Sequence, residues 1–319
     1  MKKYGFGVDV GGTTCKIGLF DNTGVILDKW EIKTNTENNG ASILDDIVAS
    51  LEGKMADAGI GKDDVEGVGI GVPGPVKNDS IVCQCVNLGW GTFDVAETLS
   101  GKIGLPVKVG NDANVAALGE MWKGGGQGCK NGVMVTLGTG VGGGVIINGS
   151  IIGGVHGAGG EIGHITVDPE GFECTCGKRG CLETVSSATG VVRLGRYLAE
   201  EYAGDSKLKA MLDNGEEVTS KDIFEMAQED DPFALMVVDR VCFYLGLACA
   251  NLGNTLNPSS IVLGGGVSAA GEFLRSRVEK YFKEFTFPQV RESTKIKLAE
   301  LGNDAGIIGA ASLALTIDN

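Results

Sequence analysis

The order of apolar and polar positions predicts three strands at the start of the chain. Residues 4–10 (YGFGVDV) and 14–20 (TCKIGLF) are two short strand-like runs, and residues 25–33 (VILDKWEIK) alternate as a third strand would. Gly11-Gly12-Thr13 between the first two runs predicts a tight hairpin turn.

A helix and a buried strand follow. Ile43, Ile47, Leu51 and Met55 recur at helical spacing within residues 41–58, so one face of that helix is apolar. The run VEGVGIGV at 65–72 reads as a buried strand that stops at Pro73. Three strands, a helix and a further strand make one α/β lobe.

The rest of the chain repeats this mixture of elements. Strands are predicted at 106–110, 133–138 and 261–266, a hairpin at 142–152, and helices at 94–104, 112–123, 184–253 (with a polar break around 203–220), 270–286 and 304–316. Strand-loop-strand elements suited to phosphate occur near residues 9 and 138. We therefore expect two related α/β lobes facing a cleft, residues 1–115 and 116–303, with the last helix, about 304–319, packing back on the first lobe.

Composition narrows the class of protein. Glycine accounts for 53 of 319 residues, more than twice the usual share of about 7%, and it gathers in clusters that suit close approach of the backbone to a ligand. The formal net charge of −14 argues against a nucleic-acid partner. Residues 131–160 lack charge, but their glycines predict strands and turns, not a membrane helix. Nine cysteines without a visible signal peptide favour a reduced, cytoplasmic location.

The first chemical motif is the segment from Asp9 to Lys16, DVGGTTCK. Its two glycines would let backbone N–H groups approach an anion, and its hydroxyls add donors. Asp9, at the end of the preceding strand, could hold Mg²⁺ through water. The alternative is an ordinary Gly-Gly hairpin turn. The spacing of a Walker loop is absent.

The second motif is LGTGVGGG at 137–144. Gly138, Gly140 and Gly143 formally fit the dinucleotide fingerprint, but that fingerprint opens a helix, and a β-branched hairpin follows here. A nicotinamide site is therefore rejected in favour of a nucleotide-phosphate hairpin. Close sheet packing could explain one or two of these glycines.

The third motif is Asn111-Asp112, after a predicted strand and before a predicted helix. From the residues alone a helix N-cap is the favoured role, because Asn and Asp are preferred there. The functional alternative makes Asp112 a general base.

The fourth motif is the most specific. His164, Cys174, Cys176 and Cys181 supply one imidazole and three thiols within 18 residues, which fits a closed structural zinc site. A disulfide is the alternative, and Cys83-x-Cys85 is a weaker candidate for a second half-site. Glu161 and Glu183 flank the four residues, and carboxylates of this kind suit either sugar hydroxyls or an exposed surface.

Taken together, these segments resemble the ROK family of bacterial sugar kinases and sugar-responsive repressors. The resemblance covers essentially the whole chain and rests on DVGGTTCK, GVGIGVPGPV, VNLGW, GNDANVAALGEMWKG, CTCGKRGCLE and LNPSSIVLGGGVS, among others. The segment around NDANVAALGEMWKG is most similar to the glucokinases of Gram-positive bacteria.

The resemblance implies a two-lobe actin-like ATPase fold (ribonuclease H-like, hexokinase-like) and phosphorylation of a hexose by ATP with Mg²⁺. It makes Asp112 the catalytic base, and it gives sugar contacts to Gly74, Asn87, Asn111, Asp112, Glu161, His164 and Glu183. The nucleotide loops would be Asp9, Gly11, Gly12, Thr13, Thr14 and Lys16; Thr139, Gly140, Val141, Gly142, Gly143 and Gly144; and Gly264, Gly265 and Gly266. The zinc ligands would be His164, Cys174, Cys176 and Cys181.

We therefore predict a cytoplasmic glucokinase that forms glucose 6-phosphate, without a nucleic-acid or membrane partner. The resemblance favours a homodimer or a higher homo-oligomer. A ROK kinase for mannose, fructose, N-acetylglucosamine or N-acetylmannosamine stays open, as do a non-catalytic sugar sensor and polyphosphate as a second phosphoryl donor.

Overall fold

The computed structural model describes residues 2–315, which form two compact units. The first comprises the described parts of residues 1–130, 144–160 and 301–319, and the second comprises 131–143 and 161–300. The lobe boundary expected after residue 115 stays a prediction, and the expected course of the last helix over 316–319 lies outside the described residues.

The first unit is built on a five-stranded sheet of order β3-β2-β1-β4-β8. Strands β1 (Tyr4–Val10), β2 (Thr14–Asp21) and β3 (Ile26–Lys33) form antiparallel pairs, whereas β4 (Val65–Val72) and β8 (Val107–Asn111) continue in parallel from β1. These five strands were predicted within one or two residues.

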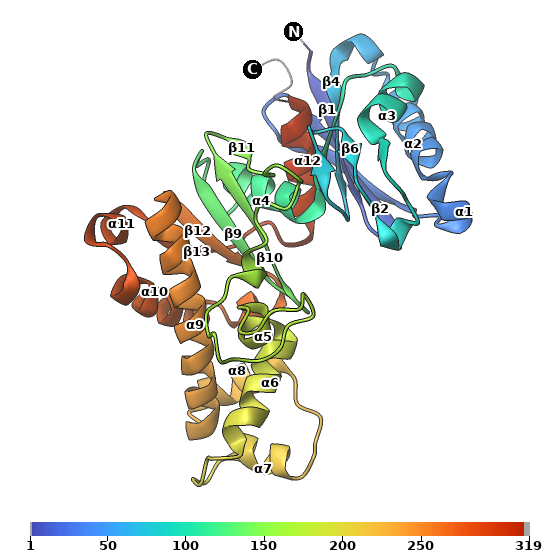
Figure 1. Ribbon diagram of the computed structural model, residues 1–319. Helices are drawn as coiled ribbons and strands as arrows, with labels where there is room; N and C mark the ends of the chain where they lie inside the picture. Colours follow the sequence, from blue (N-terminus) through green and yellow to red (C-terminus); the bar gives the residue numbers. More distant parts are fainter. Residues whose placement is uncertain (1, 316–319) are drawn as a thin grey trace. The chain divides into compact units, whose positions relative to one another are not determined.

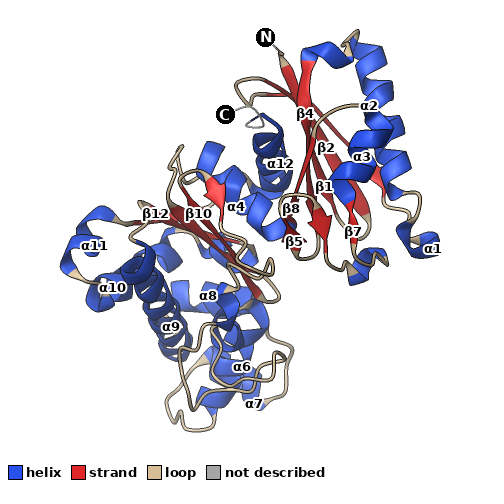
Figure 2. Ribbon diagram, turned by 45° about the horizontal axis from the view of Figure 1, so that its top comes forward, coloured by secondary structure: helices blue, strands red, loops and turns tan. Residues whose placement is uncertain are grey.

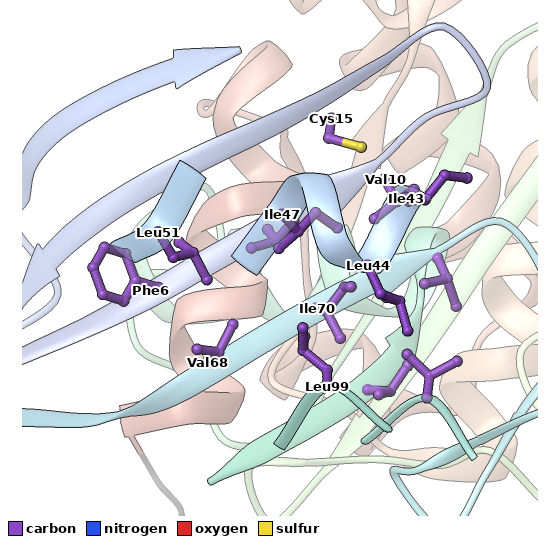
Figure 3. Close-up of a cluster of buried hydrophobic side chains, with 14 of the residues drawn as sticks. Phe6, Val10, Cys15, Ile43, Leu44, Ile47, Leu51, Val68, Ile70 and Leu99 are labelled. Atoms are coloured by element: carbon purple, nitrogen blue, oxygen red, sulfur yellow. The ribbon is translucent and has the colours of Figure 1, made fainter. Parts of the chain in front are cut away.

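Helices cover the two faces of this sheet in different ways. Alternate residues such as Phe6, Val68 and Ile70 enter a core with α2 (Ile43–Ala58) and α3 (Val95–Ile103), as Figure 3 shows for Ile47, Leu51 and Leu99. The opposite face carries α12 (Ala305–Leu315) and α4 (Asp112–Lys123) (Figure 2). Here the strands present glycine: a Cβ at Gly69 would lie 1.7 Å from the Ala310 carbonyl oxygen. Glycine therefore lets the last helix pack directly on the strand backbones.

A small sheet of β5 (Val76–Lys77), β6 (Ile81–Val82) and β7 (Phe93–Asp94) completes the first unit, with the short helix α1 (Glu37–Gly40). Strands of two residues leave no periodic signal, so the sequence did not predict them.

The second sheet has the order β11-β10-β9-β12-β13. Strands β9 (Gly132–Leu137), β12 (Ser260–Gly264) and β13 (Lys295–Leu298) are parallel, and β10 (Val141–Ile147) forms a hairpin with β11 (Ser150–Ile151). The hairpin was predicted, with its turn at Asn148-Gly149 in left-handed conformation. Strand β13 was not.

The second unit contains helices α5 to α11 (Figure 1). The stretch 184–253, which was predicted to be mostly helical, corresponds to α5 to α9. Their bounds are α5 (Glu183–Ser186), α6 (Ala188–Ala199), α7 (Lys207–Asp213), α8 (Ser220–Gln228), α9 (Pro232–Leu256), α10 (Glu272–Phe285) and α11 (Pro288–Ser293). The polar break at 203–220 contains α7 between two loops, so it was only partly irregular.

Helix α9 is long and apolar enough to cross a membrane by composition. However, 67% of its most apolar window is buried inside the protein, where it packs against α6, α8 and α10. It is therefore a core helix of the second unit.

Candidate active site

The first predicted phosphate loop lies between β1 and β2. The Gly11 N–H donates to the Thr14 carbonyl (2.9 Å), and the Thr34 hydroxyl donates to the Gly11 carbonyl (2.7 Å). Gly12 and Thr13 are exposed at the tip. The loop is thus fixed at its base while its tip can present backbone N–H groups to an anion.

Asp9 lies at the end of β1, directly across from Lys16 on β2. Its carboxylate is partly buried and makes no hydrogen bond within the described residues. Burial and the nearby charge of Asp112 raise the pKa of Asp9, while Lys16 opposes that shift. A half-buried carboxylate without a donor is a suitable ligand for a hydrated cation.

The space for Asp9 depends on Gly306 in the first turn of α12. A Cβ at Gly306 would lie 2.5 Å from Asp9 Oδ2 and 2.6 Å from its Cγ. Because the aspartate side chain is short and its Cβ, Cγ and Oδ2 all lie close to the added atom, the carboxylate could avoid the contact only by shifting from its place at the end of β1.

We therefore expect Gly306→Ala to displace Asp9, to lower kcat, and to destabilise the protein by about 1–3 kcal/mol through overpacking. Urea unfolding and steady-state kinetics would measure both effects. Gly53→Ala is the matched control: nothing lies within 4 Å of a Cβ there, within α2. It should be neutral or slightly stabilising. Equal behaviour of the two variants would contradict this role of Gly306.

Asn111 and Asp112 stand at the start of α4 and have separate roles. Asn111 is the N-cap, since its Oδ1 accepts the N–H of Asn114 (3.2 Å). Asp112 is the first helical residue, so the capping alternative does not apply to it. Its Oδ1 accepts from the Ala113 N–H (2.8 Å) and from Asn111 Nδ2 (2.9 Å), whereas no hydrogen bond engages its Oδ2 within the described residues. One carboxylate oxygen is anchored and the other is available to accept a proton.

The environment of Asp112 favours its neutral form more than water does. Burial raises the pKa of Asp112, although the hydrogen bonds from Ala113 and Asn111 work against that shift. A carboxyl group with a raised pKa is a stronger base once ionised, which suits general-base chemistry.

Two further predicted sugar residues lie in the same unit. Asn111 Nδ2 also donates to the Gly74 carbonyl (3.2 Å). Gly74 has no room for a side chain, because a Cβ would lie 2.3 Å from the Gln84 carbonyl oxygen. Asn87 neighbours the first loop, where a Cβ at Gly12 would be 3.9 Å from Asn87 Cβ. The fold thus brings both residues near the Asp9–Asp112 pair.

The second predicted phosphate loop follows β9 in the second unit. It is held from both sides: the Ala188 N–H donates to the Gly138 carbonyl (2.8 Å), and the Thr189 hydroxyl donates to the Thr139 carbonyl (3.0 Å). Glu183 Oε2 accepts the N–H of Val141 (2.9 Å). A predicted sugar residue therefore also fixes this loop.

Three glycines predicted with this loop lie within β10. A Cβ at Gly143 would be 2.4 Å from Ile162, and a Cβ at Gly144 would be 2.5 Å from Ala117. Packing thus accounts for Gly143 and Gly144, as considered from the sequence. Gly163 lies against the same strand, since a Cβ added to it would be 2.1 Å from the Val141 carbonyl oxygen. The segment that carries Glu161 and His164 therefore lies beside Val141.

The third glycine segment, Gly264 to Gly266, lies beside the second loop. Gly265 has φ +84°, and a Cβ there would lie 2.5 Å from the Leu137 carbonyl oxygen. Because β9 and β12 are parallel neighbours, both segments emerge at the same edge of the sheet.

Two hollows border this edge within the second unit. One, of about 550 Å³, is lined by Thr139, Thr189, Arg193, Arg196 and Ser220, among others. The other, of about 180 Å³, is lined by Gly266, Phe224 and Ser220 with neighbouring residues. Sequence reasoning missed Thr189, Arg193 and Arg196. The only signal was the paired arginines one turn apart on the polar face of α6.

The four predicted metal ligands converge. The ligand atoms of His164, Cys174, Cys176 and Cys181 all lie within 4.8 Å of one another, the only such group in residues 2–315. The Cys174 Sγ to His164 Nδ1 distance and the Cys176 Sγ to Cys181 Sγ distance are both 3.6 Å. Tetrahedral zinc with bonds of about 2.0–2.3 Å separates its ligand atoms by about 3.5–3.8 Å.

These distances exclude the disulfide alternative, since a disulfide needs about 2.05 Å between sulfurs; all nine cysteines are free. The knuckle itself depends on Gly177 and Gly180, which both have positive φ. A Cβ at Gly180 would lie 1.5 Å from the Asp168 carbonyl oxygen. The donor set and geometry therefore fit a structural zinc ion.

Comparison with known proteins decides the family. The ROK family model matches residues 5–317. The chain belongs to the ROK family. A glucokinase from Halalkalibacterium halodurans is 48% identical over 98% of this chain and 95% of its own length.

Solved ROK structures match along the whole length as well. A ROK family glucokinase from Streptomyces griseus, in complex with glucose and AMPPNP, has a TM-score of 0.70 at 34% identity, covering 98% of this chain and 99% of that one. The ROK hexokinase from Thermus thermophilus has a TM-score of 0.77 at 30% identity, covering 97% of each chain. The predicted two-lobe actin-like α/β fold is thereby confirmed.

Proposed function

We propose that this ROK protein is a glucokinase that transfers the γ-phosphoryl group of ATP to the 6-hydroxyl of glucose. The observation that carries the proposal is the 48% identity to a glucokinase over nearly the whole chain, and a structural relative binds glucose with an ATP analogue. The anchored carboxylate of Asp112 supplies the group that the reaction needs.

Asp112 acts as the general base. Its Oδ1 is held by Ala113 and Asn111, so Oδ2 faces the 6-hydroxyl and takes its proton while the hydroxyl oxygen attacks the γ-phosphorus. The bond to the β-phosphate oxygen breaks, and ADP leaves. Asn111 keeps Oδ2 in position by fixing the carboxylate plane.

The glycine segments stabilise the charge on the phosphoryl oxygens. Backbone N–H groups of residues 11–14 and 139–142 would donate to them, and Lys16 adds positive charge. Asp9 would hold Mg²⁺ through water, and the bound ion would neutralise charge on the β- and γ-phosphates.

The adenosine would lie at the edge formed by the second and third glycine segments. The hollow beside Thr139 and Thr189 has two guanidinium groups in its lining, Arg193 and Arg196, which suit an anionic nucleotide. Gly265 and Gly266 allow the backbone to approach the ligand there.

Glu161, His164 and Glu183 are the sugar contacts proposed in the second unit. His164 directs Nδ1 toward the thiols, so Nε2 is the nitrogen left for a sugar hydroxyl. Glu183 follows Cys181 by two residues, and zinc would therefore fix the loop that carries all three residues.

The protein is expected in the cytoplasm, as a homodimer or a higher homo-oligomer. A kinase for another hexose, a sugar sensor without activity, and polyphosphate as an additional donor are the alternatives to be separated by experiment. Retention of Asp112 and of both phosphate loops favours the enzyme over the sensor.

A pH profile tests the role of the base. Because burial raises the pKa of Asp112, kcat/KM should fall as the pH is lowered, with an apparent pKa above the ordinary aspartate value of about 3.9. The coupling of Asp9 to Asp112 makes this an apparent value of the pair. A profile that stays flat down to pH 4 would contradict the assignment.

Identification of the product tests the proposal itself. Incubation with Mg-ATP and glucose, followed by ³¹P NMR and coupling to glucose-6-phosphate dehydrogenase, should show stoichiometric ADP and glucose 6-phosphate. ADP formation without a sugar phosphate, or phosphorylation at another hydroxyl, would refute it.

A further inference from the structure

Asn114 is a buried amide whose side chain lacks a hydrogen-bond partner. It is the third residue of α4 and is only 6% exposed. Its Oδ1 is fully buried without a partner, and no hydrogen bond engages its Nδ2 within the described residues. Buried amides in proteins nearly always bond through at least one end, so this one calls for a ligand or water.

Asn114 lines a pocket of about 290 Å³ that lies wholly within the first unit. The pocket is bounded by the end of β8, the first turn of α4, the β5 segment and the loop after β11. Its polar lining comprises Lys77, Asn78, Asp79, Asn111 and Asn114, and the backbone of residues 153–155 closes one side.

The charges in this lining favour a neutral ligand. Lys77 and Asp79 carry opposite charges, and neither forms an ion pair within the described residues. Together with the three asparagine amides of the lining, each a donor and an acceptor, they offer complementary partners to hydroxyl groups. A phosphate would instead need an excess of positive charge.

The pocket also adjoins the proposed base. Asn111 lines it and hydrogen-bonds Asp112 directly. Asn111 and Asn114 are three residues apart, so their side chains project from the same first turn of the helix. A sugar whose 6-hydroxyl meets Asp112 therefore brings neighbouring hydroxyls toward this pocket.

We propose that this pocket is part of the sugar site and that Asn114 hydrogen-bonds a hydroxyl of the hexose beside the one held by Asn111. The inference rests on the proposed glucokinase function, and it adds a residue that determines which sugars are accepted.

Kinetics with deoxy sugars test this contact. Asn114→Leu and the smaller Asn114→Ser would be compared with wild type on glucose and on each monodeoxyglucose that keeps the 6-hydroxyl. We expect KM for glucose to rise about tenfold with kcat within about threefold, as for loss of one ground-state hydrogen bond. The penalty for removing one particular hydroxyl, present in wild type, should vanish in both variants.

Asn303→Leu is the control, since Asn303 lines a separate hollow of about 340 Å³ beside β2 and α12. It should leave the whole deoxy-sugar pattern unchanged. An unchanged KM in both Asn114 variants, or a rise that is equal for every deoxy sugar, would show that water satisfies Asn114 and would overturn the proposal. Failure of wild type to phosphorylate glucose would instead refute the function on which it rests.

Discussion

Asp112→Asn is expected to lower kcat by about 10²–10⁴-fold while glucose still binds. Asparagine keeps an oxygen that can accept from Ala113 and Asn111, so the start of α4 should be preserved. What it loses is an oxygen that can take the proton of the attacking hydroxyl. Steady-state kinetics and calorimetric titration with glucose would separate the two effects.

The same substitution has a predictable effect on stability. Burial raises the pKa of Asp112, so its ionised form costs folded-state stability at pH values above the folded pKa, and that cost is absent below the unfolded pKa. Asp112→Asn removes the cost. The Tm at pH 7 should therefore equal or exceed that of wild type, and any gain should disappear in acid.

Asp57→Asn, on the exposed side of α2, is the control and should retain full activity. Turnover of Asp112→Asn within a few-fold of wild type would rule out Asp112 as the base. If Asp112→Asn does not fold, Asp112→Glu replaces it in this test. Glutamate keeps a carboxylate but moves its oxygens, so this variant should retain partial activity.

Cys176→Ser is expected to lose zinc and sugar affinity together. Cys176 supplies one of four converging ligand atoms, and a hydroxyl is a poor ligand for zinc in a site built from thiolates. The knuckle carries Cys181, and Glu183, two residues later, holds the Val141 N–H. Release of the knuckle should therefore disturb both the sugar contacts and the second phosphate loop.

We expect the zinc content to fall well below one ion per chain and KM for glucose to rise at least about tenfold, in line with the effect of disturbing a metal shell. Elemental analysis and kinetics would measure these. Cys83→Ser, outside the cluster, is the matched control and should keep both properties. A zinc-free Cys176→Ser protein with wild-type KM would refute the coupling between the knuckle and the sugar site.

Much of this fold follows from local patterns. The strands around Asp9 and the glycine-rich hairpin at 141–151 were predictable because buried runs end at glycine or proline. The elements that were missed are short: β5 to β7 have two residues each, and β13 has four.

The site shows the same division. The zinc cluster was predictable because its four ligands lie within 18 residues. By contrast, Asp9 packs against residue 306 so closely that only glycine fits there. These two residues are 297 positions apart, and no spacing in the chain reveals their contact. The separate roles of Asn111 as cap and Asp112 as a carboxylate with one free oxygen also needed coordinates, since either residue type suits either position.

The most direct test of the central claim is a coupled ADP-release assay with Mg-ATP against glucose, mannose, fructose, N-acetylglucosamine and N-acetylmannosamine. The account predicts that kcat/KM is highest for glucose and that Asp112→Asn lowers the rate by at least about 10²-fold. A preference for an acetamido sugar would contradict the glucose assignment. Absence of turnover on every sugar by folded, zinc-loaded protein would contradict the kinase itself.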